Sequence, residues 1–279
     1  MFEKIIVPLD CSKLAEAALP YAEELGAKMQ SEIILLTVIG SEYHEKLVNY
    51  YNYIKKIKEA TAQYAGKYIE DETEKLPDII TVRRTGDPAK KIIEYAVEID
   101  FPLIVMASHG QTGMSRWTVG SVADKVVRAG NTQAVMLIRA NDTRADIRDK
   151  RLLRKALVPL DGSFKSESVI PYVCNIALKL QMELTLLQVL SQNGHSEADA
   201  GAYLQGVCKK VEEIIDVDVD YRVSIGSVAE TIIDLADELT VDLVAMSTRG
   251  MNRNNPLSLG SVAQKVFLAG NTPLLLIRK

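Results

Sequence analysis

The sequence predicts an α/β protein made of two tandem domains, each a doubly wound five-stranded parallel sheet covered by helices. First, the thirteen residues GSVADKVVRAGNT from Gly120 return as GSVAQKVFLAGNT from Gly260, with ten identical positions. Second, short apolar runs rich in Ile, Val and Leu alternate with longer segments of helical period. Third, 279 residues with 47% hydrophobic content are enough for two separate cores.

The repeat spans whole domains. KIIVPLDCS from Lys4 matches KALVPLDGS from Lys155, and LIVMASHG from Leu103 matches LVAMSTRG from Leu243. The offset falls from 151 to 140 between these pairs, so the second copy is eleven residues shorter. This period is far longer than the roughly 20–50 residues of solenoid repeats, which indicates domain duplication. The expected domains are 1–140 and 155–279, joined by a charged linker, 141–154, that has no clear apolar period.

The strands expected in the first copy are apolar on both faces, as in a parallel sheet with helices on each side. They are residues 5–9, 33–39, 79–83, 103–107 and 134–138. The last strand of each copy is strongly apolar, and such an edge favours pairing with another strand.

Several residues mark helix starts. Ser12 and Ser163 directly follow a strand, Asp87 precedes a proline at the first helical position, and Ser227 with Glu230 forms a capping-box pattern. The helix after the second strand is rich in tyrosine. One of its faces is expected to pack into the core rather than to bind a partner, and that face carries Tyr50, Tyr53, Ile54, Ile57 and Tyr64.

Composition excludes several classes of function. The 33 basic and 37 acidic residues give a formal charge of −4, so no broad positive field attracts nucleic acid or an anionic membrane. Cys11, Cys174 and Cys208 are odd in number and widely spaced, which argues against a disulfide framework or a zinc site. With no signal-like segment and no run approaching 18 apolar residues, we expect a cytoplasmic protein. Cys11 is expected to be a small buried residue.

Polar residues gather where strands end. Asp10 and Asp161 follow the first strand of each copy, and Gly120-Ser121 and Gly260-Ser261 open the last helices. In doubly wound sheets, ligands bind outside the carboxyl ends of the strands. Free amides, a serine hydroxyl and a helix dipole together make an anion cradle, and glycine permits positive φ and close approach of a phosphate. The alternative is that the serine and the aspartate only cap helices and turns.

The pattern V-P-L-D-x-S, followed by a small residue, two variable positions, Gly, nine positions and Gly-Ser-Val, resembles the universal stress protein family in its tandem form. The resemblance covers nearly the whole chain. It implies a five-stranded domain of the adenine nucleotide alpha hydrolase-like type, and ATP, ADP or AMP as ligand, with or without Mg²⁺. It implies a nucleotide contact at each of these residues: Asp10, Val38, Ala107, Gly110, Gly120, Ser121, Val122, Asp161, Val189, Ser247, Gly250, Gly260, Ser261 and Val262.

Two departures from the family pattern favour the first copy as the nucleotide site. The family's first loop glycine is Ala107 in one copy and Ser247 in the other, and alanine is the milder change. Pro256 removes an amide donor from the second loop, although Arg249 or Arg253 offers a phosphate partner there.

The favoured function is a cytoplasmic stress-response module that binds an adenine nucleotide and signals to an unknown protein partner. One alternative is a slow ATP hydrolase, and another is a nucleotide-free scaffold. His109 lies in the expected pocket but has no positioned nucleophile, no P-loop or HExxH pattern occurs, and Asp10 has no second carboxylate for a metal. Enzymatic activity is therefore expected to be weak at most. The resemblance also implies an intramolecular pseudo-dimer through the last strands and allows a homodimer.

Overall fold

The computed structural model describes residues 1–40, 47–70, 75–108, 119–129, 134–139, 151–191, 196–250 and 259–278. The chain forms two compact units, Met1–Leu152 and Leu153–Lys279. Most of the predicted linker lies outside the described residues. Its last part does not, since Leu152 and Leu153 are buried and the amide of Leu152 donates to Glu24 Oε2 at 3.0 Å.

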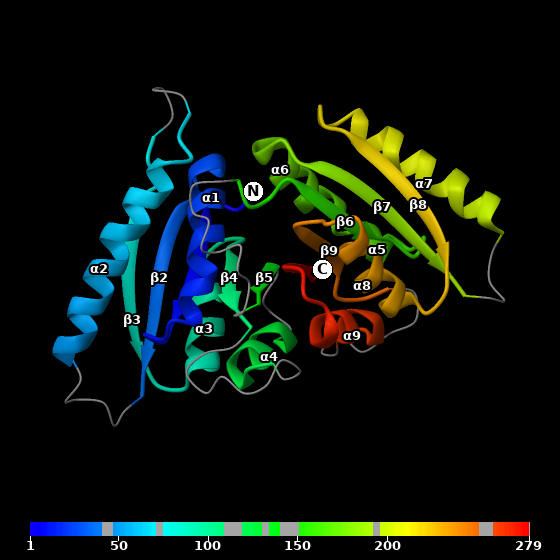
Figure 1. The fold of residues 1–279 in the computed structure, drawn as a ribbon. Helices are drawn as coiled ribbons and strands as arrows, with labels where there is room; N and C mark the ends of the chain where they lie inside the picture. The colour runs from blue at the N-terminus through cyan, green and yellow to red at the C-terminus, as the bar shows by residue number, and fades with distance from the viewer. Residues whose placement is uncertain are drawn as a thin grey trace. The chain divides into compact units, whose positions relative to one another are not determined.

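The first unit is a parallel five-stranded sheet with strand order β3-β2-β1-β4-β5 (Figure 1). All five strands predicted from the sequence are confirmed, with ends that differ by at most two residues. The elements are β1 (Lys4–Leu9), η1 (Ala15–Ala18), α1 (Leu19–Met29), β2 (Glu32–Ile39), α2 (Leu47–Gly66), β3 (Ile79–Thr85), α3 (Pro88–Val97), β4 (Leu103–Ala107), α4 (Ser121–Arg128) and β5 (Ala134–Ile138).

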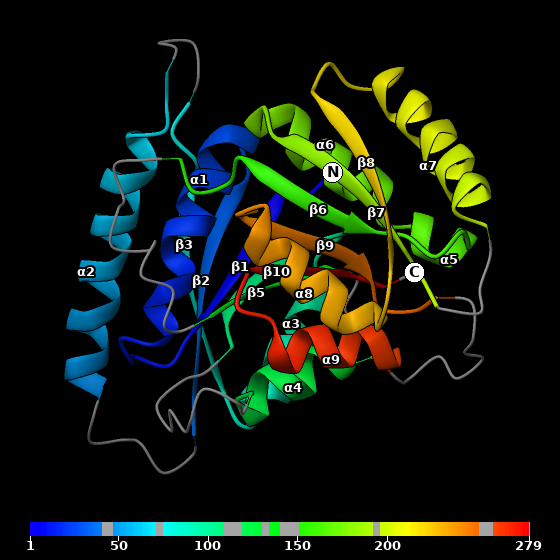
Figure 2. The same cartoon turned by 45° about the vertical axis from the view of Figure 1, so that its right-hand side comes forward.

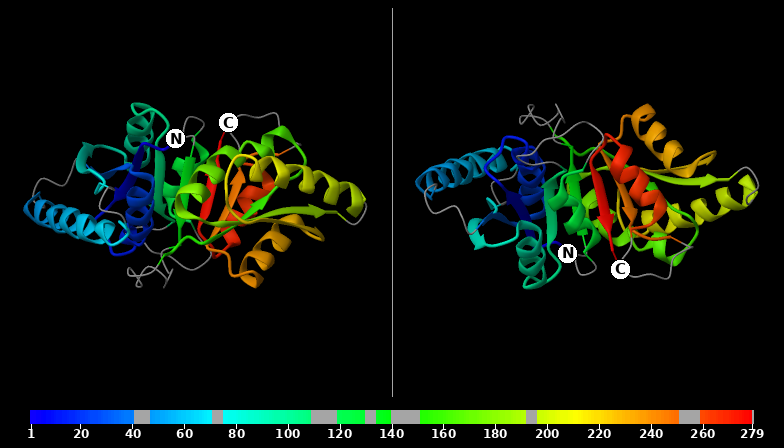
Figure 3. Two further views of the ribbon diagram at one scale, coloured as in Figure 1. Left: turned by 90° about the horizontal axis from the view of Figure 1, so that it is seen from above. Right: turned by 90° about the horizontal axis from the view of Figure 1, so that it is seen from below.

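The second unit repeats this topology with strand order β8-β7-β6-β9-β10. Helices α8 and α9 lie side by side (Figure 2), and α7 and α8 cover opposite faces of β8 (Figure 3). The elements are β6 (Lys155–Pro159), α5 (Phe164–Glu167), α6 (Ile170–Leu180), β7 (Glu183–Leu190), α7 (Glu197–Glu212), β8 (Val219–Ile225), α8 (Val228–Glu238), β9 (Leu243–Ser247), α9 (Ser261–Ala269) and β10 (Leu274–Ile277). The expected fold, two doubly wound parallel domains in tandem, is confirmed.

The last two strands of each unit are buried along their whole length. Every residue of β4, β5, β9 and β10 is buried, which explains why these strands read as continuous apolar runs. The tyrosine-rich helix α2 turns part of its predicted face inward, because Tyr50 and Ile54 are buried while Tyr53 is half-buried. Tyr51, on another face, is 55% exposed.

The predicted helix starts are mostly confirmed. The carboxylate of Asp87 caps α3 by accepting from the amide of Lys90 at 2.9 Å, and Ser163 caps α5 through the amide of Ser166. The Ser12 hydroxyl accepts from the amide of Ala15 at 3.1 Å, but the N-cap position of η1 is Leu14, whose side chain makes no capping hydrogen bond. The predicted capping box was wrong: Ser227 holds the N-cap position of α8, but its side chain makes no capping hydrogen bond.

Candidate functional site

The chain reverses its strand order at β1, and the predicted site residues of the first unit lie at that point. β1 pairs with both β2 and β4, so Asp10, Val38 and Ala107 lie at one edge of the sheet. β6 pairs in the same way with β7 and β9, which brings Asp161, Val189 and Ser247 to the corresponding edge of the second unit. Each unit therefore has a topological switch point, the place where doubly wound folds bind ligands.

The two aspartates each close a local turn. Asp10 Oδ1 accepts from the amide of Ser12 at 3.0 Å and from its hydroxyl at 2.6 Å. Asp161 Oδ1 accepts from the amide and hydroxyl of Ser163 at 3.0 Å and 2.5 Å. The turn role weighed against a ligand role is thus real. A ligand contact at either aspartate stays a prediction.

The glycines before α4 and α9 act differently from what we expected. The amide of Gly120 donates to Ser108 O at 2.8 Å and that of Gly260 to Thr248 O at 2.8 Å, so neither amide can serve an anion. Their φ angles, −60° and −62°, are not positive either. Glycine is needed here for close approach, because a Cβ on residue 260 would lie 3.0 Å from Thr248 O.

The amides that follow these glycines remain as donors. The first hydrogen bond within α4 runs from the amide of Asp124 to Gly120 O. Within the described ranges, the amides of Ser121, Val122 and Ala123 have no acceptor, and the Ser121 side chain is exposed. α9 begins in the same way, with Gln264 donating to Gly260 O. Both helix starts therefore keep the chemistry of an anion cradle, displaced by one residue from the glycine.

The loop after the fourth strand packs against the aspartate turn. In the second unit, a Cβ on Gly250 would collide with Asp161 Oδ2, so this glycine is required by the approach of the two loops. Ser247 is 8% exposed, and its hydroxyl accepts from the amide of Arg249 at 3.3 Å. Ala107 is 7% exposed. The predicted contacts at Gly110 and His109, and the effect of Pro256, lie outside the described residues.

Sequence reasoning missed an arginine in each unit. Arg139 follows β5 directly and Arg278 follows β10, so both lie at the same strand ends as the predicted site. Burial lowers the pKa of Arg139, and burial together with the charge of Arg249 lowers that of Arg278, which is 5% exposed. The repeated Ile-Arg pair after each last strand was the signal that could have found them.

A tyrosine in each unit was likewise missed as a site neighbour. Tyr53 of α2 lies near Glu16, Cys11 and Asp10, and Tyr203 of α7 lies near Glu167 and Asp161. Burial is the main reason why the pKa of both phenols is raised, and the neighbouring carboxylates add to it. The helices after the second strand therefore bring a tyrosine close to the aspartate turn of each unit.

Cys11 is exposed, so its expected burial was wrong. It has a left-handed backbone, φ 65°, where the second unit has Gly162 at φ 80°. Partial desolvation, followed by the charges of Asp10 and Glu16, raises the pKa of its thiol, which argues against an activated nucleophile.

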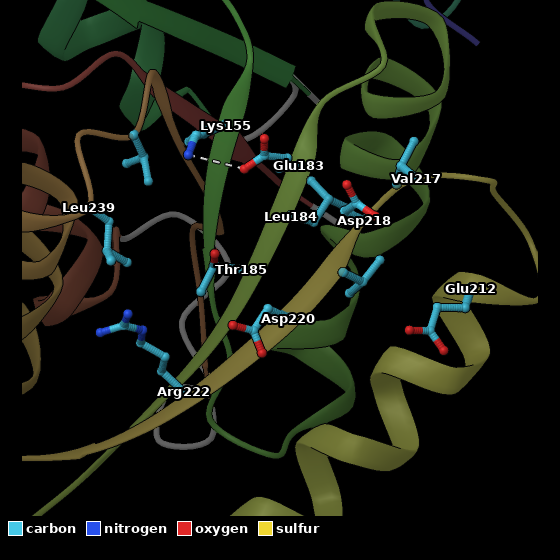
Figure 4. Close-up of a pocket in the computed structure, with 12 residues that line it drawn as sticks. Lys155, Glu183, Leu184, Thr185, Glu212, Val217, Asp218, Asp220, Arg222 and Leu239 are labelled. Atoms are coloured by element: carbon cyan, nitrogen blue, oxygen red, sulfur yellow. Dashed lines mark ion pairs between the residues drawn. The ribbon is translucent and has the colours of Figure 1, made fainter.

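A pocket of about 370 Å³ in the second unit lies at the opposite edge of the sheet, near the start of β6 and β7 (Figure 4). Its lining is strongly charged, and Lys155 pairs there with Glu183 at 3.1 Å. None of the predicted site residues lines it. Over the residues described, no three His, Cys, Asp or Glu side chains are grouped so as to hold a metal ion, and no helix is long and apolar enough to span a bilayer.

Comparison with known proteins agrees with the duplicated fold. The profile of the Universal stress protein family matches residues 1–139 and again 153–278. Universal stress protein MJ0577 of Methanocaldococcus jannaschii is 28% identical over 161 residues, covering 50% of this chain and 98% of that protein. Universal stress protein YxiE of Bacillus subtilis is also 28% identical, over 149 residues, covering 50% of this chain and all of YxiE.

Two solved structures share the architecture over nearly the full length. A universal stress protein from Archaeoglobus fulgidus has a TM-score of 0.70 at 21% identity, covering 99% of this chain and 98% of its own. A putative universal stress protein from Pseudomonas aeruginosa has a TM-score of 0.72 at 15% identity, covering 99% and 93%. At these identities the likeness concerns the fold.

Proposed function

The chain belongs to the universal stress protein family, and on that basis we propose that it binds ATP or a related adenine nucleotide as a regulatory module in a stress response. The observation that carries the proposal is the start of α4. Three consecutive amides without acceptors among the described residues, an exposed serine hydroxyl and the positive end of a helix dipole meet at the carboxyl edge of the sheet. These groups suit the phosphates.

We propose that Asp10 and Val38 contact the nucleoside end of the ligand. Asp10 stands one strand away from the loop after β4, so it reaches an amino or hydroxyl group while the phosphates lie at Ser121. Val38 is half-buried and offers apolar surface to the base. Asp161, Val189 and Ser261 would act in the same way in the second unit. Gly110, Val122, Gly250 and Val262 would complete the proposed contacts through their backbone, and Gly120 and Gly260, whose amides are occupied, would allow the phosphates to approach closely.

The proposal is of binding rather than turnover. The sequence offers no identifiable residue that would position an attacking water. A regulatory role fits this arrangement, because a ligand that contacts the loop after β4 changes the surface available to a protein partner. Slow ATP hydrolysis remains the second candidate, with Mg²⁺ as its expected requirement.

Ser121→Pro tests the proposal. Proline is tolerated at the first helical position, and Gly120 already has the extended backbone, φ −60° and ψ 142°, that suits a residue before proline. The substitution removes one amide and one hydroxyl without breaking the helix. We expect ATP to bind at least about tenfold more weakly, since hydrogen bonds to charged groups contribute about 1.5–3 kcal/mol each.

The matched control is Ser261→Pro, where Gly260 has φ −62° and ψ 151°. Calorimetric titration of both variants and of the double variant reports which unit binds and with what stoichiometry. If purified protein carries no nucleotide and ATP gives no heat and no protection against unfolding, the nucleotide-free scaffold is the correct description.

A further inference from the structure

The pocket of the second unit is lined by polar side chains that three parallel strands bring to one face of the sheet (Figure 4). Lys155 of β6 lies opposite Glu183 of β7, and Thr185 of β7 lies opposite Asp220 of β8. Because side chains alternate along a strand, Glu183 and Thr185 share a face, and so do Asp220 and Arg222. These five residues therefore line the same hollow.

The first unit packs apolar side chains at the same place. The register of β2 with β3 repeats that of β7 with β8, so the polar residues have direct counterparts. Thr185, Asp220 and Arg222 correspond to Ile34, Ile80 and Val82. Ile34 is fully buried and the other two apolar residues are half-buried, whereas Asp220 and Arg222 are exposed. This exchange gives up hydrophobic stabilisation, so it calls for an explanation other than stability.

Two of the exchanged residues have opposite charges and are held only weakly. Arg222 Nη1 lies 3.7 Å from Glu238 Oε1, and both side chains are exposed, so water screens this pair and it contributes little. Asp220 Oδ1 accepts from the amide of Tyr221 at 2.7 Å, and over the described residues its carboxylate forms no ion pair. A guanidinium binds a carboxylate through two parallel hydrogen bonds, and a carboxylate accepts from an ammonium. The pocket therefore offers one binding group of each sign.

The spacing of these two residues suits an α-amino acid. Because Asp220 and Arg222 are two residues apart on one strand, their Cα atoms are about 6.5 Å apart and their side chains rise from the same face. An α-amino acid carries its ammonium and its carboxylate on a single carbon, so one small molecule between the two side chains satisfies both. The hydroxyl of Thr185, opposite Asp220, adds a donor or acceptor beside them.

The rest of the lining determines which amino acid fits. Glu212 and Asp218 also line the pocket, and neither has a cationic partner within the parts of the chain that are described. Leu239 and Val241 add apolar surface for methylene groups. The volume of about 370 Å³ lies in the range of small-molecule sites, roughly 300–1,000 Å³. These features favour a side chain with a methylene stem and a positive end.

We propose that this pocket binds a basic α-amino acid, lysine or arginine, whose carboxylate contacts Arg222 and whose α-ammonium contacts Asp220. The second unit would then recognise a second small molecule away from the proposed nucleotide site, since none of the residues proposed to contact nucleotide lines the pocket. This inference goes beyond the proposed function and does not depend on it.

The test titrates the full chain with L-lysine and follows the backbone amide signals of β7 and β8 by NMR. We expect these signals to shift. Cadaverine, which is lysine without its carboxylate, should bind at least about tenfold more weakly, because it makes no contact with Arg222. L-Glutamate should also bind more weakly than lysine, because its side chain meets Glu212 and Asp218.

Two variants and a control separate the binding groups. Asp220→Asn should weaken lysine about tenfold, as for loss of one contact to a charged group. Arg222→Gln should weaken lysine to a similar degree, yet cadaverine should bind to it at least as well as to the parent, since a like charge is removed. Asp237→Asn removes an exposed carboxylate of α8 that does not line the pocket, and it should change neither ligand.

A variant with the residues of the first unit, Thr185→Ile with Asp220→Ile and Arg222→Val, tests the pocket itself. We expect it to fold, because the first unit packs the same side chains, and to lose lysine binding. If cadaverine binds as tightly as lysine, the pocket attracts amines through charge alone and the inference is wrong. It is also overturned if lysine shifts no signal of β7 or β8, or if this variant binds lysine like the parent.

Discussion

Cys11 has a backbone conformation that its counterpart in the second unit leaves to glycine. Its φ of 65° lies in the left-handed region, where a Cβ meets the following carbonyl, and Gly162 adopts φ 80° at the equivalent turn without that penalty. The turn itself is fixed by the aspartate and serine that both units share. The strain at residue 11 is therefore a property of the side chain and not of the turn.

We expect Cys11→Gly to stabilise the first unit by about 0.5 kcal/mol, because relief of the left-handed strain exceeds the added freedom of the unfolded chain. Chemical denaturation followed at equilibrium measures the change. Cys11→Ala keeps the Cβ and serves as control, with no expected gain. A glycine variant less stable than the alanine variant would show that the turn is not strained.

At the scale of an element, the start of α3 shows how one charge makes stability depend on pH. The Asp87 carboxylate caps this helix, and the hydrogen bond from the amide of Lys90 is the main reason why the pKa of Asp87 is lowered, with Lys125 adding a smaller attraction. A lowered pKa favours the folded state above the ordinary value of 3.8. That contribution is lost as the pH falls through the pKa of the folded state.

Asp87→Asn should therefore flatten the acid limb of the stability curve. Asparagine keeps the capping oxygen but does not titrate, so the variant should lose less stability than the parent as the pH falls below 3.8. Thermal unfolding midpoints measured across this range decide the matter. The control is Ser227→Asn at the equivalent N-cap of α8, which adds no charge and should leave the dependence of stability on pH unchanged. If the parent and Asp87→Asn lose stability equally as the pH falls, the Asp87 carboxylate is not the group responsible.

At the scale of the whole molecule, the chain that joins the units is anchored to the first of them. Leu152 is buried, and its amide donates to Glu24, a carboxylate of α1 that is itself fully buried. Removing a buried acceptor costs about 1–3 kcal/mol, so this bond holds the connecting segment against α1. The anchor lies next to Arg151, which provides a site for trypsin.

Glu24→Ala should speed tryptic cleavage after Arg151, because the Leu152 amide loses its acceptor and the segment opens more often. Limited proteolysis followed by mass spectrometry measures the rate. Glu24→Gln retains an acceptor oxygen and should be cut more slowly than the alanine variant. Equal rates for both variants and the parent would mean that burial of Leu152 and Leu153 alone protects the segment.

The sequence by itself determined the duplication, all five strands of the first unit and most helix starts. These depend on local signals, namely apolar runs buried on both faces and side chains that cap the helix immediately after them. It also placed Asp10 and Asp161 after the first strands and Ser121 and Ser261 at the starts of the last helices, and the parallel topology then brings them to one edge. The turn at Asp10 and the cap at Asp87 are decided within a few residues, so no distant contact was needed to predict them.

Only the tertiary structure decided how those groups are used. The amides of Gly120 and Gly260 donate hydrogen bonds to the residue that follows the preceding strand. Gly250 leaves space for the side chain of Asp161. Tyr53 and Tyr203 lie near the aspartate turns although they belong to a different helix. Each of these contacts joins segments that are remote in sequence. Their distance in space depends on how the helices and strands pack, which a pattern of residue types does not show. The two units also differ at a glutamate that the repeat left unchanged. Glu16 accepts from Lys13, whereas Glu167 accepts from Tyr203, which comes from a helix remote in sequence.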